Sequence, residues 1–122
     1  MASFEEHCQD CERILGNRCE EVNRWMDEDF KKFGPLHRFS KHHTRGVKEA
    51  EELFGELGRK AALVHILKDC GHIPTTRQWR DQEVDSLGMQ PGKFLGHWEG
   101  DTFVRAAQAV IRFDALRGNH AP

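Results

Sequence analysis

The sequence lacks the features that mark several large classes of protein. It contains no tyrosine, few clusters of β-branched residues and no alternating apolar run with a hairpin turn, so strands are not expected. Its best apolar run, residues 61–64, ends at His65 and is far shorter than the roughly 20 residues of a membrane-spanning helix. The N-terminus is acidic, whereas a signal peptide is basic and then apolar. We therefore expect a cytoplasmic protein that does not enter a membrane.

Signatures of common enzyme chemistry are missing as well. There is no glycine-rich phosphate loop. Ser40 lies two residues from His42, but the glycine pattern of an activated nucleophile does not surround it. No general base is identifiable, so the sequence makes no prediction of catalysis.

The four cysteines allow two interpretations. In a cytoplasmic protein they are more typical of thiols or metal ligands than of disulfides. Cys8 and Cys11 form a Cys-x-x-Cys pair, and Cys70 and His72 could complete a Cys₃His zinc site. There is no second such pair, however, and cysteines one helical turn apart are most often small buried apolar residues. A redox role for the pair would need a preceding strand, and none is predicted.

The charge of the chain is distributed in blocks. The 122 residues are enough for one domain with its own core. The net charge of −2 combines an acidic block at residues 1–30 with a basic block at residues 31–48 that has no acidic residue. The basic block could bind nucleic acid or another anion, but a solvated face paired with acidic neighbours is favoured because no continuous basic stripe follows. Its basic residues are Lys31, Lys32, Arg38, Lys41, Arg45 and Lys48.

Helical patterns follow one another along the chain and predict a compact all-α bundle of five or six helices. Ser3 and Glu6 form a capping-box pattern that opens the first helix. Gly55 and Gly58 are expected to break the chain between the third and the fourth. The expected helices span about residues 4–15, 19–33, 35–57, 59–70, 75–88 and 102–117.

A histidine set is the strongest candidate for chemistry. His65 and Asp69 are four residues apart, so they share one helix face at a spacing that lets both bind one cation. His43 lies on the apolar stripe of the preceding predicted helix, and with His42 it could complete three or four ligands. Nitrogen and oxygen ligands without thiolate suit zinc, manganese, iron or nickel. The competing interpretation is an exposed His–Asp pair and a hydrogen-bonded core histidine.

Several short motifs between residues 25 and 79 occur in one order. They are Trp25 and Asp27; Pro35, His37, Arg38, His42, His43 and Gly46; Phe54 and Gly55; and His65, Asp69, Gly71, Ile73, Pro74, Thr75 and Trp79. Together they resemble a family of small uncharacterised proteins of bacteria and phages, a domain of unknown function. The resemblance spans residues 25–79; a longer connection from Gly55 to His65 is expected in that family, and no counterpart is identified for the cysteines or the residues after 79. The resemblance brings no activity, but it implies that the histidines of this pattern and Asp69 form one set.

The leading hypothesis is therefore a helical domain that binds a divalent metal such as zinc. The predicted ligands are His43, His65 and Asp69, and the fourth ligand, or a group that holds a ligand in place, is His42, His37 or Asp27. If the site is catalytic, metal-activated hydrolysis is its natural chemistry.

The alternative hypothesis is a phage or bacterial interaction protein, for example an inhibitor of a host defence complex. Such a protein would use the charged face at residues 31–48 to contact a protein or a nucleic acid. A monomer and a homodimer are both compatible with the alternating charge.

Overall fold

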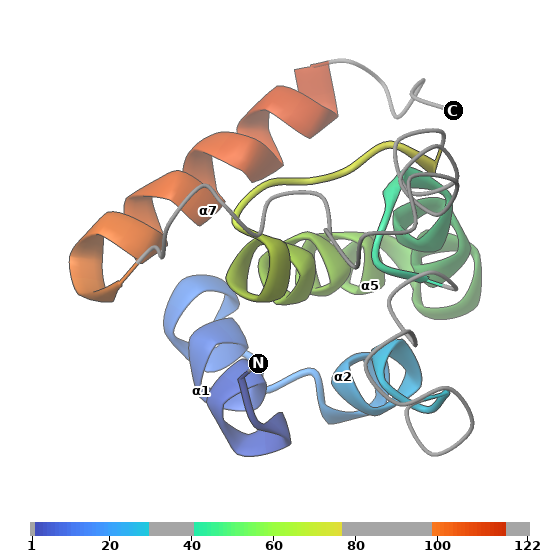
Figure 1. Ribbon diagram of the computed structural model, residues 1–122, viewed down its shortest axis with the longest axis horizontal. Coiled ribbons are helices and arrows are strands. Elements are labelled where there is room, and N and C mark those ends of the chain that lie inside the picture. The colour runs from blue at the N-terminus through green and yellow to red at the C-terminus, as the bar shows by residue number, and fades with distance from the viewer. Residues whose placement is uncertain (1, 30–40, 77–98, 117–122) are drawn as a thin grey trace, which may run out of the picture.

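The computed structural model describes residues 2–29, 41–76 and 99–116, and these ranges contain helices and no strand (Figure 1). The prediction of an all-α protein is confirmed. The helices are α1 (Phe4–Leu15), α2 (Glu20–Met26), α5 (Thr44–Cys70) and α7 (Gly100–Leu116). The predicted count of five or six is not supported, because the described ranges hold four. The helix expected at about residues 75–88 falls almost entirely outside them.

Helix α1 begins and ends as its sequence predicts. The Ser3 hydroxyl accepts a hydrogen bond from the Glu6 amide, and the Glu6 carboxylate accepts one from the Ser3 amide, both at 3.1 Å. Gly16 ends the helix in the left-handed conformation at φ 76°. The helix buries His7, Cys8 and Cys11 on the face turned toward the core.

Helix α2 is shorter than expected. It ends at Met26, although the sequence predicted a helix to about residue 33. The Asp27 amide donates to the Arg24 and Trp25 carbonyls, so the last turn tightens and the chain leaves the helical conformation at Asp27 (φ −108°, ψ 7°). This early end places the Asp27 side chain against α5 rather than on a continuing helix.

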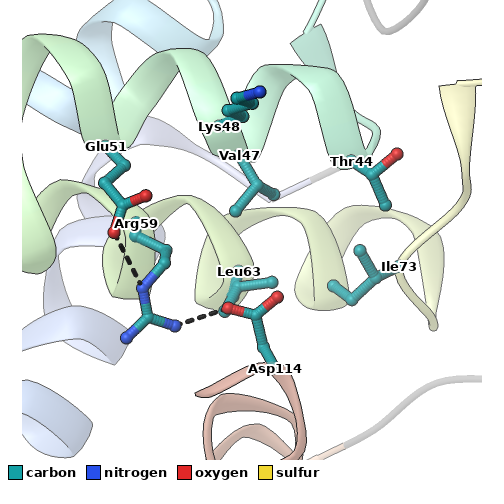
Figure 2. A pocket seen from close by; sticks show the side chains of 8 residues that line it. All are labelled: Thr44, Val47, Lys48, Glu51, Arg59, Leu63, Ile73 and Asp114. Atoms are coloured by element: carbon teal, nitrogen blue, oxygen red, sulfur yellow. Dashed lines mark hydrogen bonds and ion pairs between the residues drawn. The ribbon is translucent and has the colours of Figure 1, made fainter. Parts of the chain in front are cut away.

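Helix α5 is a hairpin of two helical arms joined at Gly55. Gly55 has φ 80° and ψ −166°, a conformation open almost only to glycine, so the predicted break occurs here. The arms run antiparallel: Arg59 lies beside Glu51 near the turn, while the Pro74 carbonyl accepts from the Thr44 amide at the other end (Figure 2). A Cβ at Gly58 would lie 2.6 Å from the Ala50 carbonyl oxygen, so glycine at this position lets the arms approach closely.

The first arm of α5 starts at Thr44, not near residue 35 as predicted. Residues 42 and 43 are a bend, and His43 is the N-cap, whose Nδ1 accepts from the Gly46 amide at 3.4 Å. His43 therefore does not lie on an apolar helical stripe. A Cβ at Gly46 would lie 1.7 Å from the Lys41 carbonyl oxygen, so the bend depends on glycine at that position.

The second arm of α5 is the centre of the fold. Residues 61–67 are all buried there, and α1, α2 and α7 pack against α5. Helix α7 contributes Phe103, which is 2% exposed and receives the Lys68 ammonium 4.7 Å from its ring centroid. None of the helices in the described ranges has the length and apolar character needed to cross a membrane.

Candidate metal centre

Two carboxylates and three imidazoles meet beside the second arm of α5. His65 and Asp69 project from that arm, as their four-residue spacing predicts. His7 comes from α1, Asp27 from the end of α2, and His42 from the bend before α5. His7, Asp27, His65 and Asp69 each offer a ligand atom within 4.8 Å of the others. The cluster therefore joins three helices and a connecting segment at one polar point in the core.

The four contacts between the imidazoles of His42 and His65 and the carboxylates of Asp27 and Asp69 have lengths that are compatible with a tetrahedral metal site. His42 Nε2 lies 3.1 Å from Asp69 Oδ2 and 3.5 Å from Asp27 Oδ1. His65 Nε2 lies 3.3 Å from the same Asp69 oxygen and 3.2 Å from the same Asp27 oxygen. Ligands bound at about 2.0–2.1 Å in a tetrahedron are about 3.3–3.4 Å apart. The imidazoles of His42 and His65 are inclined at 71° with centroids 5.0 Å apart, and both Nε2 atoms approach the same two carboxylate oxygens.

The proton on His65 is fixed by Asn23. Asn23 Nδ2 donates to the carbonyl oxygens of Arg18 and Cys19, both at 3.1 Å. These oxygens only accept, so the amide oxygen of Asn23 must face His65 Nδ1, at 2.8 Å. His65 Nδ1 therefore carries hydrogen, and its Nε2 is left to meet the two carboxylates through a second proton or a metal ion.

His7 has a different place in the cluster. Its ring stacks on His65, with centroids 3.6 Å apart and planes 12° apart. Two stacked imidazoles cannot both direct an in-plane lone pair at one ion between them. His7 Nε2 lies 3.2 Å from Asp69 Oδ1, although not at a hydrogen-bond angle. His7 therefore approaches the Asp69 oxygen that His42 and His65 do not contact.

Burial and mutual contact set the protonation of the cluster. Burial alone would lower the pKa of His65, but hydrogen bonds to Asp27 and Asp69 outweigh it and raise the pKa to about 9. Burial lowers the pKa of His42 to about 3, and it also lowers the pKa of His7. Burial opposes ionisation of Asp69, yet its contacts with His42 and His65, and the nearby imidazole of His7, hold its pKa well below the ordinary value. Without a metal, His65 is thus the cationic member.

The cluster is enclosed except at Asp27. The imidazoles of His7, His42 and His65 are all 0% exposed. The Asp69 side chain is also at 0%, whereas that of Asp27 is 26% exposed. An ion would therefore reach the cluster past Asp27.

The predicted site residues are only partly brought together. His65, Asp69, His42 and Asp27 meet as described above. The His43 ring instead lies near Thr76, whose hydroxyl is 3.1 Å from His43 Nδ1. His37 lies outside the described residues. His7 is not among the predicted ligands, because no spacing in the sequence links α1 to the second arm of α5.

The alternative zinc set is not assembled in this part of the structure. Cys8, Cys11 and Cys70 are buried and form no disulfide, and His72 Nδ1 lies 3.4 Å from the Cys70 carbonyl oxygen. Across the described ranges, no group of three close ligand atoms includes a cysteine.

The basic block is represented by three described residues. Lys41 is 8% exposed, and its ammonium contacts the Trp25 carbonyl oxygen and the Glu28 carboxylate. Arg45 and Lys48 are exposed on the first arm of α5, while Lys31, Lys32 and Arg38 lie outside the described residues. For Lys41, pairing with an acidic neighbour is therefore the observed arrangement.

A second polar arrangement borders a small pocket between the arms of α5 and helix α7 (Figure 2). The pocket is lined by Thr44, Val47, Lys48, Glu51, Arg59, Leu63, Ile73 and Asp114. The Arg59 guanidinium contacts Asp114 and lies 3.5 Å from both Glu51 and Glu56. Because carboxylates surround it on three sides, Arg59 ties the helices together rather than presenting a cation to a ligand.

Comparison with known proteins places the chain in a family. The family described as "Domain of unknown function (DUF6915)" matches residues 2–87. The chain belongs to this family, and the prediction of a family of unknown function is confirmed. All five residues of the cluster lie within the match, whereas α7 lies beyond it. No curated protein and no solved structure matched the chain significantly.

Proposed function

We propose that this protein binds one divalent metal ion through His42, His65, Asp27 and Asp69. The observation that carries the proposal is His65 Nε2, which faces two carboxylate oxygens at 3.2 and 3.3 Å while Asn23 engages the opposite ring nitrogen. A metal-bound histidine commonly donates its other N–H to a fixed acceptor, which sets the ring orientation. Here the Asn23 amide oxygen is that acceptor.

The charge of the cluster supports a divalent ion. Two carboxylates and three neutral imidazoles carry −2, and a buried charge of this size is costly unless it is compensated. A proton on His65 leaves −1 in the cluster, whereas a divalent cation brings it to zero. Metal binding would then displace the His65 proton, since a ligand nitrogen must be unprotonated.

The ligand set supports zinc first and manganese, iron or nickel after it. Two imidazoles and two carboxylates without thiolate are compatible with all of these ions, but the near-tetrahedral spacing favours zinc. Structural zinc sites are closed and use four protein ligands. The burial of His42, His65 and Asp69 supports such a structural ion, which would hold α2, the bend and α5 together.

Metal analysis of one matched pair of variants tests the proposal. Tag-free protein is stripped with a chelator, dialysed against Zn²⁺ or Mn²⁺ and analysed by mass spectrometry for bound metal. We expect about one equivalent per wild-type chain and less than about a tenth in Asp27→Ala. Asp29→Ala is the control, because the Asp29 side chain is similarly exposed, at 29% against 26%, and lies outside the cluster.

Two results would overturn the proposal. The first is wild-type protein that retains less than about a tenth of an equivalent of either ion. The second is equal metal content in Asp27→Ala and Asp29→Ala, which would place the ion elsewhere.

A further inference from the structure

His7 is a buried imidazole whose hydrogen-bonding capacity is not used. Its side chain is 0% exposed, yet neither ring nitrogen forms a hydrogen bond with the described residues. Such atoms are rare in folded proteins, because a polar group that leaves water without gaining a partner destabilises the fold. Burial also lowers the pKa of His7, so at neutral pH the ring is uncharged and one nitrogen has an unused lone pair. A metal ion binds an imidazole in this state.

The Asp69 carboxylate offers one oxygen to each side of the cluster. Oδ2 lies 3.1 Å from His42 Nε2 and 3.3 Å from His65 Nε2, beside the ion proposed above. Oδ1 lies 3.2 Å from His7 Nε2 and accepts the Ala2 amide at 3.4 Å. The contact with His7 is close but lacks a hydrogen-bond angle, so the ring nitrogen is not directed at the oxygen. Two ligands of one tetrahedral ion have the same relationship, since they lie about 3.3 Å apart and both point at the ion.

The stack of His7 on His65 determines where an ion bound to His7 would lie. The rings are 12° from parallel with centroids 3.6 Å apart, and both Nε2 atoms approach the same Asp69 carboxylate. Each lone pair lies in the plane of its own ring, so an ion bound to His7 would be about one ring spacing from an ion bound to His65. Two-metal sites in proteins hold their ions about 3.5–4 Å apart. The stack therefore has the spacing of a two-metal site.

We propose that the cluster binds a second divalent ion through His7 Nε2 and Asp69 Oδ1, with the Asp69 carboxylate bridging the two ions. Asp27 offers an oxygen within 4.8 Å of the ligand atom of His7, which makes it the nearest further protein ligand in the cluster, and water would complete the coordination. The second ion rests on the proposed function, because Asp69 bridges only when His42 and His65 hold the first.

The second ion should bind more weakly than the first. It has fewer protein ligands, and the first ion already neutralises the carboxylates of Asp27 and Asp69. A second divalent ion would leave an excess positive charge in a buried site, and the two ions repel each other. A bridging water that loses a proton would reduce this excess. We expect the second ion to bind at least about tenfold more weakly, at free concentrations that already fill the first site.

Titration of the full-length, tag-free protein tests the inference. Equilibrium dialysis at increasing free Mn²⁺ or Zn²⁺, up to about 1 mM, counts the bound equivalents. Electron paramagnetic resonance of the Mn²⁺ samples shows whether two bound ions are neighbours. We expect one equivalent with the six-line signal of an isolated Mn²⁺ at low free metal. At higher free metal a second equivalent should bind, and magnetic coupling across about 3.6 Å should broaden or abolish that signal.

A pair of histidine variants assigns the second equivalent. His7→Leu removes the proposed ligand at similar volume and leaves the four ligands of the first ion in place. It should bind the first equivalent as wild type does and no second equivalent up to about 1 mM free metal. His72→Leu is the control for adventitious binding to a histidine, because His72 lies outside the cluster, beside the Cys70 carbonyl oxygen. It should bind both equivalents.

The possible failures are distinguishable. Wild-type protein that stops at one equivalent of both ions, or takes up a second Mn²⁺ without magnetic coupling, would overturn the inference and leave the proposed function standing. A second equivalent retained by His7→Leu would overturn it as well. Loss of the first equivalent from folded His7→Leu would place His7 at the first ion instead. Wild-type protein that binds neither Mn²⁺ nor Zn²⁺ would refute the proposed function itself. If His7→Leu does not fold, the wild-type titration and its resonance spectrum decide.

Discussion

Asn23 Oδ1 lies 2.8 Å from His65 Nδ1, and this hydrogen bond joins α2 to the second arm of α5 inside the core. The amide cannot rotate without losing its bonds to the Arg18 and Cys19 carbonyls. His65 is consequently held both in its ring orientation and in its tautomer. One uncharged side chain thus decides which nitrogen of His65 faces Asp27 and Asp69.

Replacing Asn23 by leucine tests this relationship. Leucine has a similar volume but cannot accept the hydrogen bond from His65, so Zn²⁺ affinity is expected to fall about 10–100-fold. Folding stability should fall by about 1–3 kcal/mol, because buried polar partners are left unsatisfied. Chelator competition and urea unfolding measure the two effects.

The control for Asn23→Leu is a variant that loses stability without touching the cluster. Gly58→Ala serves, because Gly58 lies between the arms of α5, near Ala50 and Phe54. It should bind Zn²⁺ as wild type does when folded. Unchanged affinity in Asn23→Leu would mean that the amide does not orient a metal ligand.

The pH dependence of metal-free stability follows from the opposite pKa shifts of two histidines. Folding raises the pKa of His65 from 6.5 to about 9, so the stability that His65 contributes is complete below pH 6.5 and is lost as the pH rises through 9. Folding lowers the pKa of His42 from 6.5 to about 3, so the stability that neutral His42 contributes is complete above pH 6.5 and is lost as the pH falls toward 3. Metal-free protein should therefore be most stable near pH 6.5.

Saturating Zn²⁺ should remove the loss on the alkaline side only. The ion takes the place of the His65 proton, so raising the pH no longer leaves two carboxylates without a cation. Urea unfolding between pH 4 and pH 9.5, with chelator or with Zn²⁺, measures both curves. Parallel decline of the two curves above pH 7 would contradict this account.

The sequence predicts local features of this protein well and distant contacts poorly. The Ser3 capping box and the break at Gly55 depend on neighbouring residues, and both are present. The approach of His65 to Asp69 follows from helical spacing alone. His7 could not be connected to them, because its stacking on His65 depends on how α1 packs against α5.

The position of His43 shows why helix periodicity misled at one point. The pattern of apolar residues continues through the bend, so it places His43 inside a helix. The bend instead depends on the Lys41 carbonyl occupying the space that Gly46 leaves empty, a contact that periodicity does not encode. The bend makes His43 an N-cap and brings His42, its neighbour in sequence, to Asp69.

Alanine at either glycine of the α5 hairpin should destabilise the fold, for a different reason at each position. A methyl group at Gly55 would meet no other atom, but the backbone conformation there is unsuitable for alanine. We expect Gly55→Ala to lower folding stability by about 1–3 kcal/mol. The helical backbone at Gly58 suits alanine, but the methyl group would lie against the Ala50 carbonyl oxygen. We expect Gly58→Ala also to lower folding stability by about 1–3 kcal/mol. Urea unfolding measures both, and a Gly58→Ala protein within about 0.5 kcal/mol of wild type would show that the arms pack less closely.

Helix α7 should depend on Arg59 for its attachment to α5. Arg59 is 4% exposed and contacts Asp114 of α7 as well as Glu51 and Glu56 of its own hairpin (Figure 2). Arg59→Met keeps much of the aliphatic stem but leaves these carboxylates without their cation, so we expect folding stability to fall by about 1–3 kcal/mol.

Lys60→Met is the matched control. Among the ion pairs in the described ranges, Lys60 contacts only Glu56, at 3.7 Å, and exposed pairs contribute about 0–1 kcal/mol. Limited proteolysis adds a local readout: Arg59→Met should be cleaved in α7 faster than wild type, and equal cleavage rates in both variants would show that Phe103 and its apolar neighbours hold the helix without Arg59.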